Sequence, residues 1–145
     1  MTLEDLLAER EIQRTLFKVA RGMDERDWTG LVELFWPDAT AEIGTGPLAG
    51  SAAIIATFRR FLDVCGPTQH LLGNVLIDVE GDEARSSAYV FDRHLGLGEK
   101  ARLTFATLGE YQDEWRKHEG LWRISHRRKL NHASVGDISI FQRPG

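Results

Sequence analysis

Residues 66–84 read GPTQHLLGNVLIDVEGDEA, and the change from helical to strand periodicity that decides the fold occurs in this stretch. Upstream of it, apolar residues recur at helical spacing; from residue 68 onward, apolar and polar residues alternate, as is typical of half-buried β-strands. EGDE at 80–83 supplies the glycine that a tight hairpin turn favours. The strand nevertheless begins with three polar residues, Thr68, Gln69 and His70. Such residues either lie at a wet strand end or line a cavity.

The segment before residue 66 predicts helices. Thr2 with Asp5 three residues later is typical of a helix N-cap, and the apolar spacing continues that helix to about Gly22 or beyond. Asp27 predicts the cap of a second helix. The apolar face of this second helix is expected to contain Trp28, Leu31, Val32 and Phe35.

A turn is expected at Pro37–Asp38, followed by a short strand, and Gly50–Ser51 predicts the start of a third helix that Gly66–Pro67 ends. The buried face of that helix is predicted to contain Ile54, Ile55, Phe58 and Leu62. Strands are predicted at about 68–79, 83–95, 102–116 and 121–133. Helices followed by long antiparallel strands indicate an α+β domain spanning 1–145, in which a curved sheet wraps the helices and leaves a pocket.

The totals exclude several classes of protein. The length of 145 residues suits one domain, and the net charge of -4 with dispersed Lys and Arg argues against a nucleic-acid-binding surface. No apolar stretch has the length of a membrane span, and residues 1–15 do not resemble a signal peptide. Cys65 is the single cysteine, so no internal disulfide is expected and a cytoplasmic location is the default. No phosphate-binding loop or nucleophile elbow occurs, and no cofactor is expected.

Asp24 follows Ala20 by four residues, so a continuing helix places its carboxylate on the apolar stripe, whereas Glu25 and Arg26 are expected to be solvated. A carboxylate on a buried face costs several kcal/mol unless it is paired. The alternative is that the helix ends at Gly22 and that Asp24 is a loop residue.

Strand alternation predicts which residues share a face with His70. One face would carry His70, Leu72, Asn74 and Leu76, and the other Leu71, Val75, Ile77 and Val79. If the first face is inward, His70 and Asn74 line the pocket. An aspartate that accepts from one imidazole nitrogen leaves the other available as a base. Taken alone, His70 fits a structural histidine with satisfied hydrogen bonds better than a catalytic one.

Four further residues are candidates for the pocket. His94 shares a strand face with Asp92, although it can also lie exposed beside the following loop. Tyr111 is either a pocket residue or a cross-strand aromatic, and His126 and Arg128 continue the face of Trp122 and Ile124 or form a solvated strand end. No His-x-His or His-x-x-x-His pair occurs, so no metal site is predicted.

GMDERDW, TQHLLGN, a histidine 24 residues after His70, and EGLWRISHRR together resemble the nuclear transport factor 2-like superfamily. The order and spacing of these motifs resemble its SnoaL-like branch, which includes scytalone dehydratase and hexachlorocyclohexane dehydrochlorinase. The resemblance covers nearly the whole chain. It implies a cone of three helices packed in a strongly curved, mainly antiparallel sheet around an apolar pocket.

The resemblance also implies site residues. In both named enzymes an Asp before the second helix pairs with a His that opens a strand, which matches Asp24 and His70; His94 matches a second pocket histidine. Two tyrosines that hold a water in scytalone dehydratase are matched by Met23 and Ile43. A different residue must therefore activate a carbonyl, and the candidates for substrate binding are Asn74, Tyr111, His126 and Arg128.

These observations predict a cofactor-independent lyase or isomerase of the dehydratase type. It would act on a hydrophobic cyclic small molecule, with Asp24, His70 and His94 as catalytic residues. The alternative is a non-catalytic module of the same fold that binds a small molecule or serves in assembly. An apolar outer stripe at Leu71, Val75, Ile77 and Val79 would predict a homo-oligomer, most simply a dimer.

Overall fold

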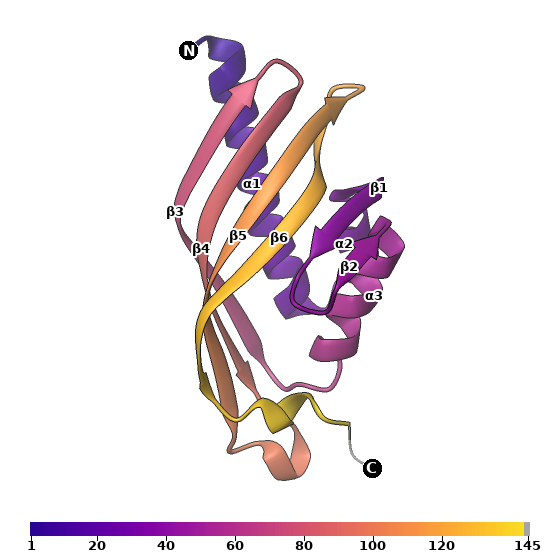
Figure 1. Cartoon of the computed structure of the whole chain (residues 1–145), viewed down its shortest axis with the longest axis vertical. Coiled ribbons are helices and arrows are strands. Elements are labelled where there is room, and N and C mark those ends of the chain that lie inside the picture. The colour runs from indigo at the N-terminus through magenta and orange to yellow at the C-terminus, as the bar shows by residue number, and fades with distance from the viewer. Residues whose placement is uncertain (144–145) are drawn as a thin grey trace.

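The computed structural model describes residues 1–143 and shows helices packed along one side of a curved sheet (Figure 1). The elements in chain order are α1 (Leu3–Glu25), α2 (Trp28–Val32), β1 (Phe35–Glu42), β2 (Pro47–Ala49), α3 (Ser51–Leu62), β3 (Thr68–Glu80), β4 (Glu83–Leu95), the short 3-10 helix η1 (Gly98–Lys100), β5 (Thr104–His118), β6 (Leu121–Gly136) and a second 3-10 helix, η2 (Ile138–Phe141).

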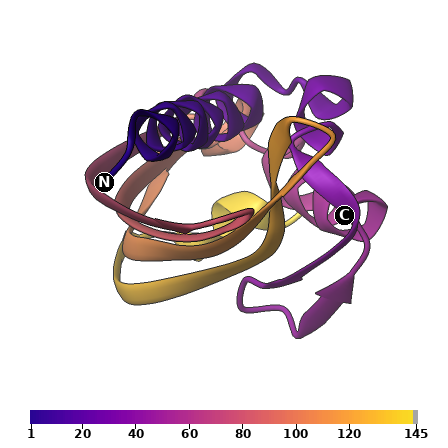
Figure 2. The ribbon, with the colours of Figure 1, turned by 90° about the horizontal axis from the view of Figure 1, so that it is seen from above.

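The sheet has six strands in the order β2-β1-β6-β5-β4-β3. Neighbouring strands are antiparallel except β1 and β6, which are parallel. Seen from above, the sheet curls and α1 lies across its concave side (Figure 2). The α+β class and the cone architecture expected from the sequence are thereby confirmed.

The predicted helix caps are present. Thr2 Oγ1 accepts from the Asp5 backbone N–H at 3.1 Å, and Asp5 Oδ2 accepts from the Thr2 backbone N–H at 3.0 Å. Asp27 caps α2 by accepting from the Gly30 N–H at 3.1 Å. Because α1 continues to Glu25, Asp24 belongs to the helix and not to a loop.

The turn predicted at Pro37–Asp38 is wrong, because both residues lie within β1. The register of β1 against β6 shifts between Phe35 and Thr40, and such an irregularity accommodates a proline that cannot donate to the ladder. Phe35 itself begins β1 and is not part of the second helix. The pairing of β1 with β6 joins two segments far apart in the sequence, which local periodicity does not encode.

The hydrophobic core fills the space between the helices and the concave face of the sheet. It includes Ile12, Leu16 and Val19 of α1, Ile54, Ile55, Phe58 and Leu62 of α3, and Val90, Trp115 and Ile124 of the sheet. The residues predicted for the buried face of α3 are all in this core. No helix within residues 1–143 has both the length and the apolar character required to cross a membrane.

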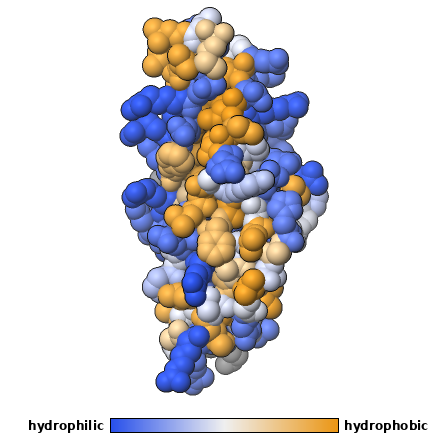
Figure 3. All heavy atoms as spheres, turned by 90° about the vertical axis from the view of Figure 1, so that its left-hand side faces the viewer, coloured by the Kyte–Doolittle hydropathy of each residue, from blue (hydrophilic) through white to orange (hydrophobic). Residues whose placement is uncertain are grey.

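Apolar side chains also remain on the convex face of the sheet. Figure 3 shows a band of them along the side of the molecule on which β3 forms the edge. Leu71, Phe91 and Leu108 are 55%, 45% and 49% exposed and are register partners across β3, β4 and β5. They form a continuous apolar row on the outer face.

Candidate active site

Asp24 and His70 contact each other where the C-terminal end of α1 meets the start of β3. The His70 Nδ1 lies 2.6 Å from Asp24 Oδ1, and the His70 backbone N–H donates to Asp24 Oδ2 at 3.0 Å. The Thr68 hydroxyl donates to Asp24 Oδ1 at 2.9 Å. A carboxylate so placed holds the imidazole proton on Nδ1 and leaves Nε2 as the acceptor.

The expectation that Arg26 is solvated is wrong. Its guanidinium donates to the carbonyl oxygens of Leu62 and Gly66 at 3.2 and 2.8 Å, and to Thr68 Oγ1 at 2.8 Å. Arg26 has a left-handed backbone (φ 59°) that ends α1, which turns its side chain back toward β3. Arg26 thus fixes Thr68, whose hydroxyl in turn bonds Asp24.

The environment of Asp24 favours its ionised form. Burial acts to raise the pKa of Asp24, but the hydrogen bonds from His70 and Thr68 and the charge of His70 outweigh it and lower the pKa below its ordinary value. Asp24 is therefore an anion that can stabilise an imidazolium at His70.

His94 lies beside His70 on the inner face of β4. The two ring centroids are 5.6 Å apart in an edge-to-face arrangement, and His94 is only 6% exposed. Its Nδ1 lies 3.1 Å from the Phe105 carbonyl oxygen, so Nδ1 carries the proton and Nε2 is an acceptor. Burial lowers the pKa of His94, against the opposing effects of Asp92 and the Phe105 carbonyl.

Asn74 does not share a face with His70. The register of β3 against β4 jumps from Gly73–Tyr89 to Leu76–Ser87, and Asn74 occupies this bulge with a left-handed φ of 50°. The extra residue reverses the alternation, so Asn74 is exposed. The residues Val75, Ile77 and Val79, expected on the outer face, instead pack partly buried against the core.

A second bulge changes the inner face of β6. Ile124 pairs with Trp115 and His126 pairs with Glu114, which leaves Ser125 as the extra residue. Of the two interpretations of His126 and Arg128, a strand end outside the inner face is the one that the structure supports. His126 is half-buried and shares a 2.7 Å hydrogen bond with Thr40 Oγ1, and Arg128 is exposed.

Arg127 and Lys129 take the inner positions that the bulge creates. Arg127 is fully buried, donates to both carboxylate oxygens of Asp113 at 2.8 and 2.9 Å, and stacks 3.9 Å from the centroid of the Tyr111 ring. Tyr111 is thus inside, as one of the two sequence interpretations had it, and burial raises its pKa. Lys129 Nζ lies 2.5 Å from Asp92 Oδ2.

Sequence reasoning overlooked Asp92, Lys129 and Arg127 as functional candidates. Asp92 had a signal, because it alternates with His94 along β4. Lys129 and Arg127 had none, since their inward direction depends on the bulge at Ser125. Met23 and Ile43, at the positions of two family tyrosines, are apolar side chains that belong to the core or pack against it.

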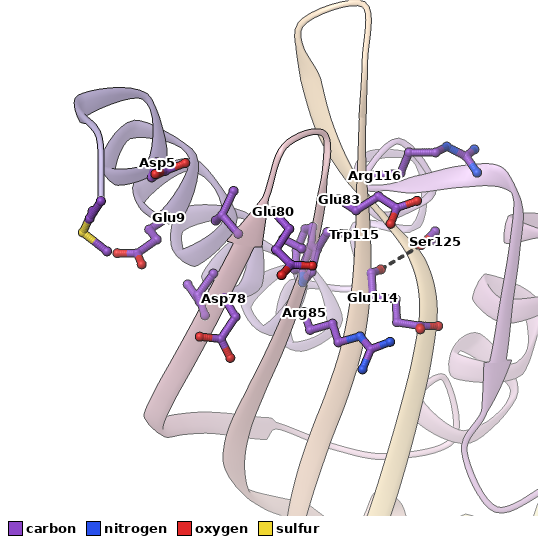
Figure 4. A pocket seen from close by; sticks show the side chains of 14 residues that line it. Asp5, Glu9, Asp78, Glu80, Glu83, Arg85, Glu114, Trp115, Arg116 and Ser125 are labelled. Carbon is purple, nitrogen blue, oxygen red and sulfur yellow. Dashed lines mark hydrogen bonds between the residues drawn. The ribbon is translucent and has the colours of Figure 1, made fainter.

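A large surface hollow lies elsewhere. It measures about 880 Å³ and carries the carboxylates labelled in Figure 4, from Asp5 and Glu9 of α1 to Glu114 of β5. Three other hollows measure about 430–450 Å³, and none of the four is lined by Asp24, His70 or His94. Phe141 of η2 packs 5.1 Å from His94 and 5.6 Å from Phe61 between ring centroids, so η2 covers His94.

No group of three or more His, Cys, Asp or Glu residues suited to holding a metal ion occurs within residues 1–143. Cys65 is buried, and burial raises its pKa to about 11. A thiol with such a pKa is a poor nucleophile at neutral pH. The titratable side chains that lie beside His70 are the carboxylate of Asp24 and the imidazole of His94. Both are groups that can take up and release protons.

Three helices packed on a six-stranded, mostly antiparallel curved sheet define a class of small α+β proteins. The chain belongs to the SnoaL-like domain family, which it matches over residues 4–128. The uncharacterized protein Rv2910c of Mycobacterium tuberculosis is 28% identical over 131 residues, covering 88% of this chain and 87% of that protein.

Two solved structures extend the likeness. A scytalone dehydratase-like protein of Novosphingobium aromaticivorans is 25% identical with a TM-score of 0.83, and the match covers 93% of this chain and 91% of that one. The hexachlorocyclohexane dehydrochlorinase LinA-type3 of Novosphingobium barchaimii is 19% identical with a TM-score of 0.82 and 99% coverage of both chains. The second likeness shows the fold alone.

Proposed function

We propose that the protein is a cofactor-independent lyase or isomerase of the dehydratase type that acts on a hydrophobic cyclic small molecule. The single observation that carries the proposal is the 2.6 Å contact between His70 Nδ1 and Asp24 Oδ1, which leaves His70 Nε2 as a base beside His94. The family fold and the dehydratase and dehydrochlorinase names of its structural neighbours support a lyase or isomerase.

In the proposed reaction, His70 Nε2 removes a proton from a carbon next to an electron-withdrawing group, and Asp24 stabilises the resulting imidazolium. The C–H electron pair passes toward the electron-withdrawing group and then forms the new double bond when the C–O bond to a neighbouring hydroxyl breaks. That hydroxyl takes a proton from His70 directly, or through His94, and leaves as water. General acid-base catalysis of this kind contributes on the order of 10²–10⁴-fold.

The rival function is a non-catalytic module that binds a small molecule. Its specific support is that Asp24, His70 and His94 line none of the four described hollows and that Phe141 covers His94. Under the catalytic proposal the C-terminal segment must move to admit substrate. A cytoplasmic location and a homo-oligomeric state are parts of the same proposal.

Replacing His70 by Gln removes the base while preserving most of the side-chain volume, and replacing Asp24 by Asn keeps the shape but weakens the imidazolium. Against a panel of cyclic β-hydroxy ketones and enones, both variants should retain ligand affinity within about tenfold, or about 1.4 kcal/mol, while turnover falls by about 10² or more. Deuterium exchange followed by NMR and loss of water are the measurements.

His132→Gln is the matched control, because His132 is exposed at the far end of β6. It should leave binding, exchange and elimination at the wild-type level. A wild-type protein that binds a panel member tightly but exchanges no faster than the His70→Gln variant would establish the binding module instead.

A further inference from the structure

Lys129 brings a cationic group to the inner face of the sheet. Its Nζ lies 2.5 Å from Asp92 Oδ2 and 3.4 Å from Thr107 Oγ1, and 16% of the side chain is accessible. An ammonium group has three N–H donors, and these are its two acceptors in the described part of the chain. One donor is therefore available to a bound molecule.

Asp92 holds this ammonium group in place. Its carboxylate has no exposed surface, accepts from the Thr107 hydroxyl at 2.6 Å, and lies 3.7 Å from His94 Nδ1. Burial acts to raise the pKa of Asp92, but the charge and hydrogen bond of Lys129 and the bond from Thr107 lower it below its ordinary value. A buried carboxylate of this kind would be strongly destabilising without its partner.

The ammonium group also lies near the proposed base. Asp92 is the register partner of His70 across β3 and β4, and register partners on one face have Cβ atoms about 4.5–5.5 Å apart. Asp92 is in turn the partner of Thr107 across β4 and β5. His70, Asp92 and Thr107 therefore form one row, and the ammonium of Lys129 contacts Asp92 and Thr107 within it.

Removal of a proton next to a carbonyl places negative charge on the carbonyl oxygen, and a fixed donor at that oxygen lowers the barrier. The candidates Asn74, His126 and Arg128 are outside, as described above. Arg127 gives Nε and Nη2 to Asp113, and its remaining nitrogen, Nη1, has no partner among the described residues but is completely buried. Lys129 is the inward cation with an accessible donor.

We infer that Lys129 binds the carbonyl oxygen of the substrate and stabilises its enolate, so that the substrate is an enolisable ketone or enone and not a halogenated hydrocarbon. The inference rests on the proposed function. His70 takes the proton from the α-carbon, the C–H electron pair moves to form the enolate, and the oxygen accepts a hydrogen bond from Lys129. The enolate then expels the β-hydroxyl, which leaves as water with the proton returned by His70 or His94.

Phenols test this without turnover, because a phenolate resembles an enolate in charge and geometry. With para-nitrophenol as the probe, its absorbance reports whether the bound form is the phenolate. The wild type should bind the phenolate at least tenfold more tightly than the phenol. The double variant Asp92→Asn/Lys129→Met removes both charges, so that no carboxylate is left unpaired, and should lose this preference.

Asp92→Asn alone should strengthen phenolate binding several-fold, because the ammonium loses its counter-charge. A purely structural role for the pair would not give opposite signs in these two variants. Lys18→Met is the control, since Lys18 is an exposed residue of α1, and it should match the wild type. Equal affinity of wild type and double variant for the phenolate would overturn the inference.

The same variants separate this inference from the proposed function. His70→Gln should abolish deuterium exchange but retain the phenolate preference. Phenolate binding that depends on Lys129, together with exchange that does not depend on His70, would refute the proposed base and leave the oxygen site intact. If exchange depends on His70 but phenolate binding does not depend on Lys129, the oxygen site is refuted and the proposed base is retained.

Discussion

Asp24 lies on the apolar stripe of α1, where an unpaired carboxylate would destabilise the folded protein. Three hydrogen bonds, all from Thr68 and His70 of β3, compensate its partial burial. Arg26 extends this set, because it binds Thr68 and two carbonyl oxygens of the α3–β3 connection. The end of α1 and the start of β3 are therefore fixed relative to each other by polar contacts, and the geometry of His70 follows from them.

The lowered pKa of His94 predicts the pH dependence of stability. In the unfolded chain His94 takes up a proton near its ordinary pKa of 6.5, whereas the folded protein resists protonation because the ring is buried. The folded state thus binds fewer protons, and the free energy of unfolding should fall as the pH decreases from about 7 to about 5. Asp24 and Asp92, whose pKa values are lowered, lose their contributions only in a more acidic range.

Urea unfolding of the wild type and His94→Gln at pH values across this window measures the effect. The variant should show a shallower dependence on pH, and His118→Gln, at the exposed end of β5, should keep the wild-type slope. An unchanged slope in His94→Gln would mean that another group is responsible.

At the scale of elements, bulges decide which side chains face inward. Period-two alternation correctly placed His70 on β3 and His94 on β4, because no register shift intervenes near them. It failed beyond Asn74 and beyond Ser125, where one extra residue reverses the side chains that follow. On β6 a further extra residue, His132, reverses them again before the strand ends. The helix caps and the boundaries of α3 were predictable because their signals are local, whereas the bulges and the parallel pairing of β1 with β6 depend on tertiary contacts.

The backbone conformation of the bulge at Asn74 can be tested by substitution. Asn74 has a φ of 50°, a conformation that Asn and Gly tolerate and that costs other residues roughly 1–2 kcal/mol. Asn74→Gly should therefore leave the free energy of unfolding nearly unchanged, while Asn74→Val should lower it by about 1–2 kcal/mol in urea unfolding. Equal stability of the two variants would show that the strand relaxes out of this conformation.

At the scale of the whole molecule, the outer face of the sheet bears on assembly. Of the apolar stripe expected at Leu71, Val75, Ile77 and Val79, Leu71 is exposed on the outer face, whereas the other three pack against the core. The row of Leu71, Phe91 and Leu108 takes its place, because its side chains cross three strands on the exposed face. In a two-fold contact between two copies of this row, each residue would be buried in both copies.

The row predicts a dimer that one substitution disrupts. Leu108→Glu places two charges in a two-fold interface and removes two buried leucines, each worth roughly 1.5–3 kcal/mol. The dissociation constant should therefore rise by about a hundredfold or more. Sedimentation equilibrium at micromolar concentration should find the wild type dimeric and Leu108→Glu monomeric. Leu97→Glu is the control, because Leu97 is 53% exposed but lies in the loop before η1, outside the row. A wild type that sediments as a monomer would show that the outer row is not a dimer interface. The contact of Asp24 with His70 on the inner side would be unaffected by that result.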